Sequence, residues 1–209
     1  MAARVGGCGT PPGGSTRLGE PGFGCVVLAA GEGRRFGGAK QIALLDGRPL
    51  LDLVLDAALG VPALDPVVVV LGAWAAAVRE AVDLSSVTVV EALDWSEGQA
   101  ASLRAGVEAL GSVSAAVVLL ADMPFVTPQV IAASMDHFTS TVDAVRTLYG
   151  GRPGHPVVLG RRVLARVPGL RGDVGARAVM QDVRVREWEA GHLCDPTDID
   201  TPDQLEVSA

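Results

Sequence analysis

The 209-residue chain has few cysteines, one lysine and no long apolar run. Its three cysteines, Cys8, Cys25 and Cys194, lie far apart and lack C-x-x-C spacing, which argues against a disulfide framework or a zinc site. A reducing cytoplasm is therefore the expected setting. No stretch approaches the roughly 18 apolar residues of a membrane span, and the N-terminus lacks the apolar segment of a secretory signal. We therefore expect no contact with a membrane.

Positive charge is also scarce, because 17 Lys and Arg residues face 24 Asp and Glu residues and the net charge is −7. Such a chain repels the phosphate backbone of nucleic acids, so we expect no nucleic-acid partner. Lys40 is the single lysine of the chain, and it lies in a glycine-rich segment. One explanation is compositional, in that arginine has replaced lysine elsewhere in the chain and Lys40 is the one that remains. The other is that the segment needs a compact ammonium where a planar guanidinium does not fit.

The fold class follows from apolar runs that alternate with helical patterns. Hydrophobic residues make up 49 % of the chain, which is typical of a globular protein and excludes a mostly disordered one. Short Val-rich runs, as expected for strands covered on both faces, lie at 25–30, 67–71, 87–90 and 115–121. Helical spacing of apolar residues lies between and after them, at 49–59, 73–83, 99–110 and 127–138.

This order predicts an α/β domain, a three-layer sandwich with a mostly parallel mixed sheet and helices on both faces. Shorter or alternating runs at 142–148, 156–159 and 183–188 predict antiparallel additions to that sheet. No linker interrupts residues 23–209, so we expect one domain there. Residues 1–22 are rich in Gly and Pro and are predicted to be a flexible leader. Ligands of such sheets bind at the carboxyl ends of the strands.

The segment after the first strand, which we call the glycine loop (residues 28–40, LAAGEGRRFGGAK), has the features of an anion site. Its glycines let the backbone approach a ligand, its free N–H groups can hold phosphate, and Arg34, Arg35 and Lys40 supply positive charge. A P-loop is excluded because Ala39 and Gln41 flank Lys40.

Three interpretations of the glycine loop remain. A dinucleotide-binding turn fits its G-x-G-x-x-x-G spacing. However, the second apolar run, at 67–71, is followed by Gly72 and not by the acid that binds ribose in such folds. A loop that wraps the phosphates of a nucleoside triphosphate fits the cations. A solvated turn is the third possibility, although a plain turn does not need this density of Gly and Arg.

The glycine loop resembles the L-A-A-G-x-S-x-R-M-G-x-x-K signature of MobA-like nucleotidyltransferases, with Gly31, Arg35, Gly37 and Lys40 at matching positions. The chain departs from the signature at Gly33, Phe36 and Ala39, where the family has Ser, Met and often Pro. The resemblance implies a glycosyltransferase-A-like nucleotidyltransferase fold. It also implies that Arg35 and Lys40 are catalytic residues on the triphosphate, and that the nucleotide lies against Leu28, Ala29, Ala30, Gly31 and Gly33.

A carboxylate, Asp122, directly follows the apolar run at 115–121. Since an unpaired buried carboxylate is costly, we expect it to have a cation or hydrogen-bond donors nearby. Mg²⁺ bridging Asp122 and phosphate oxygens would meet that need, and a turn Asp is the alternative. The D-x-P element resembles the family's metal-binding acid. The C-terminal DIDTPDQL resembles its closing element, which implies Asp200 as a second metal ligand; the alternative is that Asp200 or Thr201 caps the last helix.

Three further segments bear on the branch of the family. WSEGQAASLRAG (95–106) resembles a base-binding element, implying nucleotide contacts from Gly98, Gln99 and Ser102, or else an ordinary helix start. GRPGHPVVLG (151–160) resembles a motif of the molybdenum cofactor enzymes and implies that His155 contacts the acceptor. LRGDVGAR (170–177) resembles an element of the cytidylyl-transferring enzymes and implies that Asp173 and Arg177 also bind the acceptor. Asp173 is expected to cap the following helix, and Arg177 either faces the pocket or pairs with that acid. The remaining candidates are interpreted as core or surface residues: Cys25, Trp74, Trp95, His137, Trp188 and His192.

The resemblance is therefore nearest to the molybdenum cofactor cytidylyltransferases. It implies that CMP passes from CTP to a phosphate-bearing acceptor of the molybdopterin type, with Mg²⁺ as cofactor and pyrophosphate as product. A molybdoenzyme or its chaperone is a further partner that it implies. Guanylyl or sugar-phosphate transfer, an NAD(P)H-dependent oxidoreductase, and a nucleotide-binding regulator or chaperone remain as alternatives.

Overall fold

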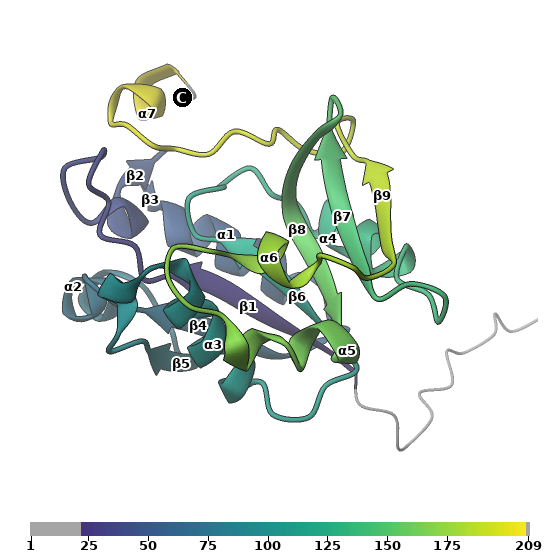
Figure 1. Cartoon of the computed structure of the whole chain (residues 1–209). Helices are drawn as coiled ribbons and strands as arrows, with labels where there is room; N and C mark the ends of the chain where they lie inside the picture. Colours follow the sequence, from purple (N-terminus) through teal and green to yellow (C-terminus); the bar gives the residue numbers. More distant parts are fainter. Residues whose placement is uncertain (1–21, 208–209) are drawn as a thin grey trace, which may run out of the picture.

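The computed structural model describes residues 22–207 and centres on a seven-stranded sheet in the order β5-β4-β1-β6-β8-β7-β9 (Figure 1). Its strands are β1 (Phe23–Ala29), β4 (Leu64–Leu71), β5 (Thr88–Glu91), β6 (Ala115–Leu120), β7 (Ala144–Tyr149), β8 (Arg152–Gly160) and β9 (Val185–Glu189). All seven predicted runs form these strands. Of the predicted leader, residues 1–21 lie outside the described part of the chain.

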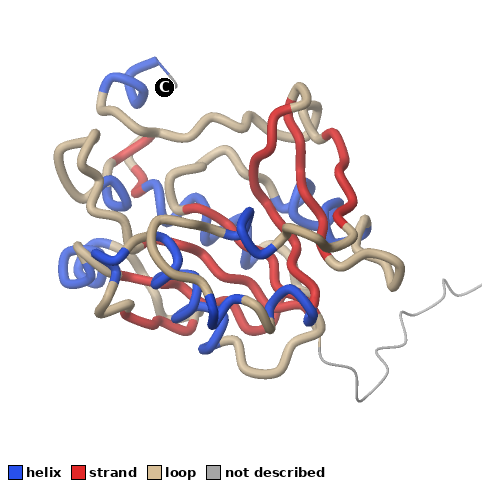
Figure 2. Tube along the Cα trace, viewed as in Figure 1, coloured by secondary structure: helices blue, strands red, loops and turns tan. Residues whose placement is uncertain are grey.

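The sheet is mixed, as predicted. β5, β4, β1 and β6 run parallel to one another, while β8 is antiparallel to both of its neighbours, β6 and β7. At the far edge β9 pairs parallel with β7. Because β1 and β6 are parallel neighbours, the loops that follow them leave from the same edge of the sheet (Figure 2). That edge is where the functional residues are expected.

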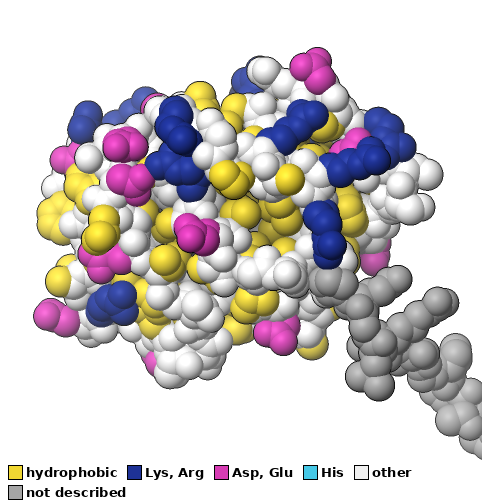
Figure 3. All heavy atoms as spheres, turned by 60° about the horizontal axis from the view of Figure 1, so that its bottom comes forward, with side chains coloured by type: hydrophobic (Ala, Val, Ile, Leu, Met, Phe, Trp, Pro, Cys, Tyr) yellow, Lys and Arg dark blue, Asp and Glu magenta, His cyan; other side chains and the backbone are white. Residues whose placement is uncertain are grey.

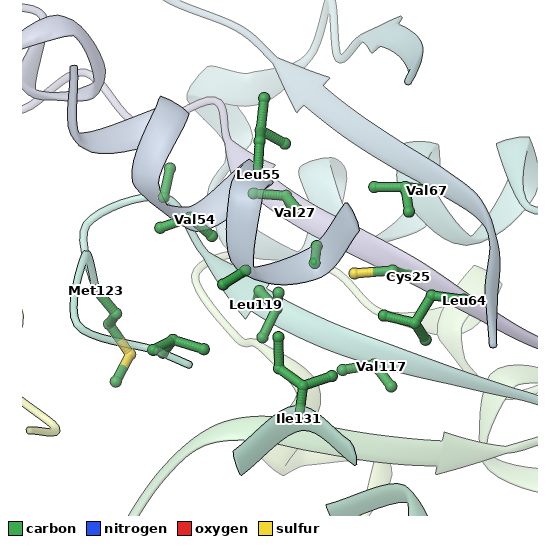
Figure 4. Close-up of a cluster of buried hydrophobic side chains, with 14 of the residues drawn as sticks. Cys25, Val27, Val54, Leu55, Leu64, Val67, Val117, Leu119, Met123 and Ile131 are labelled. Atoms are coloured by element: carbon green, nitrogen blue, oxygen red, sulfur yellow. The ribbon is translucent and has the colours of Figure 1, made fainter. Parts of the chain in front are cut away.

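Helices cover both faces of the sheet and complete three layers. One face carries α1 (Leu50–Leu59), α2 (Ala75–Ala81) and α4 (Pro128–Asp136); the other carries α3 (Gln99–Ala109), α5 (Arg161–Leu164) and α6 (Ala176–Val179). Successive strand residues point to opposite faces, so Cys25 and Val27 pack in the first core and Val26 in the second. Figure 4 shows Val54 and Leu55 of α1 and Ile131 of α4 packed over Val27 and Leu119 in the first core.

Several short elements were not predicted. A hairpin, β2 (Leu44–Leu45) with β3 (Arg48–Pro49), follows the 3-10 helix η1 (Lys40–Ile42). The others are η2 (Trp95–Glu97), η3 (Val167–Gly169) and α5, whereas α7 (Asp203–Val207) is the last helix that the alternative interpretation of Asp200 assumed. A third, smaller core joins Leu45, Leu50 and Ile199, and it fixes the segment before α7 against the hairpin.

The surface carries charges of both signs. Figure 3 shows Lys and Arg side chains scattered among Asp and Glu side chains on one face, without a continuous basic stripe there. None of the helices in residues 22–207 combines the length and apolar character needed to cross a bilayer.

Candidate active site

A cleft of about 760 Å³ opens at the carboxyl ends of β1 and β6. Two segments far apart in sequence form its walls, the glycine loop and the stretch from η2 into α3. All the residues predicted to be catalytic, nucleotide-binding or metal-binding line it: Leu28, Ala29, Ala30, Gly31, Gly33, Arg35, Lys40, Gly98, Gln99, Ser102, Asp122 and Asp200. The structure thus brings these predicted residues into one site, and their individual roles remain predictions.

Lys40 lies between the two predicted metal ligands. Its Nζ donates to Asp122 Oδ2 at 2.7 Å and to Asp200 Oδ1 at 2.9 Å. The Lys40 side chain is 15 % exposed, so these ion pairs are shielded from solvent far more than ordinary surface pairs are. Burial alone would lower the pKa of Lys40, but the carboxylates of Asp122 and Asp200 outweigh it and raise that pKa above its usual value. The ammonium therefore stays charged at neutral pH.

Backbone contacts bring Asp200 to the cleft. The Ile199 N–H donates to the Asp122 carbonyl at 2.8 Å, and the buried Ile199 side chain anchors the segment in the third core. The Asp200 carboxylate also accepts from Arg35 at 3.2 Å, and the hydrogen bond from Lys40 is the main cause that lowers its pKa. Its side chain does not cap α7. The reverse arrangement occurs, in which the Gln204 side-chain oxygen accepts from the Asp200 N–H at 2.7 Å and from the Thr201 N–H at 2.8 Å.

The glycine loop presents backbone donors. Gly33 has φ +69°, and its carbonyl accepts from the Gly37 N–H at 2.8 Å. A Cβ at Gly33 would overlap the Gly38 carbonyl oxygen, which explains why serine is not found there as in the family signature. None of the N–H groups of residues 31–36 donates to another residue within 22–207. A run of free N–H groups beside two arginines and a lysine is a site for anionic oxygens.

The opposite wall depends on a close crossing of two segments. Gly98, with φ +115°, leaves no room for a side chain, because a Cβ would lie 2.6 Å from the Gly172 carbonyl carbon. The Gly172 carbonyl accepts from the Ala100 N–H at 3.2 Å. The prediction that Asp173 caps the following helix is wrong: Gly175 occupies the N-cap of α6 without a side-chain hydrogen bond. Asp173 Oδ1 instead accepts from the Gln99 N–H at 3.4 Å, since the crossing places it at the start of α3.

A second cavity of about 600 Å³ adjoins the first and shares Leu28, Gln99 and Asp173 with it. The three residues predicted to bind the acceptor line this cavity: His155, Asp173 and Arg177. Its other walls are mostly apolar and come from β6, β8 and α6. The structure therefore places His155 and Arg177 in the second cavity, apart from the predicted triphosphate residues, whereas Asp173 lies at the boundary between the two cavities.

The charges of the second cavity are few. Arg177 is exposed and has no ion-pair or hydrogen-bond partner within residues 22–207, whereas Arg146 pairs with Glu187 at 2.8 Å. Burial lowers the pKa of His155 to about 4, although the charge of Asp198 opposes this shift. At neutral pH the imidazole is uncharged, so Arg177 is the free cation that faces this cavity.

Two residues that were not predicted to be site residues, Trp95 and Gln41, line the first cleft, and a third, Trp74, contacts the glycine loop. Trp74 and Trp95 were interpreted as core or surface residues, but Trp95 lines the cleft and Trp74 Nε1 donates to the Glu32 carbonyl at 2.8 Å. Gln41 was used only to exclude a P-loop, yet it is 5 % exposed and holds two loop carbonyls. Both tryptophans lie in the segments that connect β4 and β5 to the next helices at this edge, and that position is the feature from which their role could have been inferred.

The donor set of the cleft fits a hard divalent cation. Asp122 and Asp200 offer carboxylate oxygens, and Asp122 Oδ1 is buried without a hydrogen-bond partner among the described residues. No group of three or more His, Cys, Asp or Glu side chains in residues 22–207 forms a complete metal cage. Two carboxylates with open positions are the arrangement in which a ligand's phosphate oxygens complete the coordination.

Fold and cleft together define an α/β enzyme of the nucleotidyltransferase type. A model of the MobA-like NTP transferase domain matches residues 25–188. The chain therefore belongs to the MobA-like NTP transferase family.

Two relatives illustrate the range of the similarity. Nicotine blue oxidoreductase of Paenarthrobacter nicotinovorans is 30 % identical over 196 residues, covering 86 % of this chain and 93 % of its own length. The crystal structure of Rv0371c from Mycobacterium tuberculosis H37Rv has a TM-score of 0.79 at 29 % identity, covering 90 % of this chain and 97 % of that one. A further structure of Rv0371c, described as a complex with manganese, matches with a TM-score of 0.76 at 28 % identity, covering 90 % of this chain and 97 % of that one.

Proposed function

We propose that this chain transfers CMP from CTP to a phosphate-bearing acceptor of the molybdenum cofactor type and releases pyrophosphate. The observation that carries the proposal is the position of Lys40 Nζ, within hydrogen-bond distance of Asp122 and Asp200 and beside the free N–H groups of the glycine loop. An ammonium, two carboxylates and free N–H donors thus share one cleft, and this supports the binding there of a triphosphate together with a metal ion, as nucleotidyl transfer requires.

The side chains have separate tasks in this reaction. Arg35 and Lys40, with the loop N–H groups, bind the triphosphate and neutralise the charge that develops on the α-phosphate and the leaving pyrophosphate. Asp122 and Asp200 would hold Mg²⁺, which when bound supplies further positive charge to the phosphate oxygens. The acceptor phosphate attacks the α-phosphorus in line, so no covalent intermediate with the enzyme is needed.

The choice of CTP and of a molybdopterin-type acceptor rests on the two motif elements that meet at the second cavity. His155 comes from the G-H-P element and Arg177 from the G-D-x-G-A-R element, and both line this cavity beside the cleft. Arg177, which is exposed at this cavity and has no partner among the described residues, would bind the acceptor phosphate. We further propose that the reaction runs in the cytoplasm and that a molybdoenzyme or its chaperone receives the product.

A second candidate function is an NAD(P)H-dependent oxidoreductase. The relative named nicotine blue oxidoreductase favours it, because 30 % identity extends over 86 % of this chain. A dinucleotide could place its pyrophosphate on the same loop N–H groups. Against it, Gly72 and Ala73 follow β4, where dinucleotide-binding folds have the acid that binds ribose.

One heat-denaturation panel separates these functions. CTP, GTP, ATP, UTP and NADPH, each with Mg²⁺, are added in turn, and the ligand that binds the folded protein raises its Tm. We expect CTP to give the largest shift and CTP with acceptor to release pyrophosphate. Protection by GTP or UTP would mean that this nucleotide, and not CTP, is the substrate. Protection by NADPH alone, with loss of NADPH absorbance on turnover, would favour the oxidoreductase. Protection by a nucleotide without pyrophosphate release would indicate a regulator.

A further inference from the structure

The carbonyls at the start of the glycine loop are all engaged. The five consecutive carbonyls of residues 29–33 accept, in order, from Gln41 Nε2, the Ala73 N–H, Gln41 Nε2, Trp74 Nε1 and the Gly37 N–H, at 2.8, 3.2, 2.8, 2.8 and 2.8 Å. The N–H groups of residues 31–36 have no acceptor within the described chain. The loop is therefore polarised, with its acceptors bonded to protein and its donors left over.

One side chain supplies two of these five bonds. Gln41 is buried at 5 % exposure, and its single NH₂ group donates to both the Ala29 and the Gly31 carbonyls. Its Oε1 is buried and has no hydrogen-bond partner among the described residues. A buried acceptor without a partner costs free energy, so the two bonds donated by Nε2 must offset that cost. These two bonds are also the side-chain hydrogen bonds that orient the amide among the described residues. Glutamate, methionine and leucine cannot replace it, because none carries two N–H groups on one atom.

We propose that Gln41 is a positioning residue that gives the glycine loop its selectivity for anions; the inference rests on the proposed nucleotide site. If the two carbonyls were released, the peptide groups that follow Ala29 and Gly31 could turn and aim a carbonyl oxygen at the phosphates. A carbonyl in that place repels the charge that an N–H would bind. Gln41 also directly follows Lys40, so it couples the loop's backbone donors to the ammonium that faces the same cleft.

The experiment compares Gln41→Met with the wild type and with a matched control, Ser134→Ala. Ser134 is fully buried in α4 and also donates to a backbone carbonyl, that of Ile131 at 2.7 Å, but it lies outside the cleft. Affinity for Mg²⁺–tripolyphosphate and Mg²⁺–CTP is measured by calorimetry. We expect Gln41→Met to weaken both by about tenfold or more, whereas Ser134→Ala leaves them unchanged.

Hydrogen exchange of the ligand-free proteins gives a readout that does not depend on nucleotide binding. Gln41→Met should raise amide exchange in residues 28–38 while exchange in the strands stays at the wild-type level. If the wild type binds no nucleotide but the loop still loosens, the proposed function fails and the structural role of Gln41 stands. If the wild type binds nucleotide and neither loop exchange nor affinity changes in the variant, the inference is overturned.

A third variant, Gln41→Glu, gives a pH-dependent readout that a purely structural role of Gln41 would not produce. It also keeps the proposal testable if Gln41→Met does not fold. Its carboxyl can donate one hydrogen bond when protonated and none when ionised. The ratio of variant to wild-type affinity should therefore rise as pH falls, and the ratio cancels titration of Asp122 and Asp200, which both proteins share. A ratio that does not depend on pH would contradict the role assigned to Gln41.

Discussion

The two adjoining cavities treat charge in different ways. In the first cleft, Lys40, Arg35, Asp122 and Asp200 form a connected set of ion pairs, so each charge already has a partner in the protein. In the second cavity the walls are mostly apolar, Arg177 has no partner among the described residues, and burial keeps His155 uncharged at neutral pH.

This difference in charge pairing indicates which kind of ligand each cavity fits. A connected set of charges can rearrange around a metal ion and a polyphosphate, because each new contact replaces an existing one. A single free cation in apolar surroundings selects a ligand with one anionic group on a less polar body. The comparison therefore supports the proposal that the nucleotide binds in the first cleft and the acceptor in the second cavity, and four variants test it.

The largest effect is expected from Asp122→Asn. The change removes a carboxylate charge from both Lys40 and the proposed metal site while keeping the shape of the side chain. We expect turnover to fall by about a hundredfold or more, with the fold intact. Pyrophosphate release with CTP and acceptor measures it, and Asp136→Asn, on an exposed residue at the end of α4, is the control. Retention of a near wild-type rate would remove Asp122 from the chemistry.

The next largest effect is expected from Lys40→Arg, which keeps the positive charge. The ammonium fits between two carboxylates at 2.7 and 2.9 Å, and a planar guanidinium cannot reproduce both contacts in the same space. We expect kcat/KM for CTP to fall by roughly thirtyfold. An arginine variant as active as the wild type would show that the single lysine of the chain reflects amino-acid composition and not the geometry of the cleft.

A smaller and selective effect is expected from Arg177→Gln. Because Arg177 faces the second cavity, KM for the acceptor should rise by about tenfold while the affinity for CTP stays the same. Arg161→Gln, on an exposed arginine of α5 that lines neither cavity, is the matched control. An equal loss of CTP affinity in the Arg177 variant would show that the two cavities are one site.

The smallest effect at neutral pH is expected from His155→Gln. The folded pKa of His155, about 4, lies below its unfolded value of 6.5, so its contribution to stability is complete above pH 6.5 and is lost as pH falls toward 4. In the wild type this loss amounts to at most about 1.4 kcal/mol per pH unit in that window. Urea unfolding between pH 7 and 4 should show a shallower dependence in the variant. Equal slopes would mean that His155 titrates normally.

The fold was largely predictable because the Val-rich runs by themselves indicate buried strands. A strand buried on both faces must be apolar throughout, so β1, β4 and β6 were visible as unbroken runs. The run at 87–90 was also found, but β5 is an edge strand with no fully buried residue, so its predicted burial on both faces is wrong. The carboxyl-end rule then located the glycine loop and Asp122. Asp200 was found by resemblance alone, since no local pattern shows that it lies beside residue 40.

What the sequence did not show depends on contacts between distant segments. The crossing of residues 170–175 over the start of α3 redirects Asp173 from its own helix to Gln99, and no periodicity reports such a contact. The role of Gln41 was hidden for a similar reason, because a buried glutamine gives no signal until its two carbonyl partners are known. Short elements such as the β2–β3 hairpin are held by the third core and not by their own propensity.

The hydrogen bond from the Ile199 N–H to the Asp122 carbonyl means that the cleft depends on a segment outside the sheet. All seven strands precede this residue in the chain, so a version shortened after β9 would keep the whole sheet and lack the second carboxylate. Such a version would also lack Ile199 from the third core, so the truncation that leaves Lys40 with one counter-charge also removes packing from the β2–β3 hairpin.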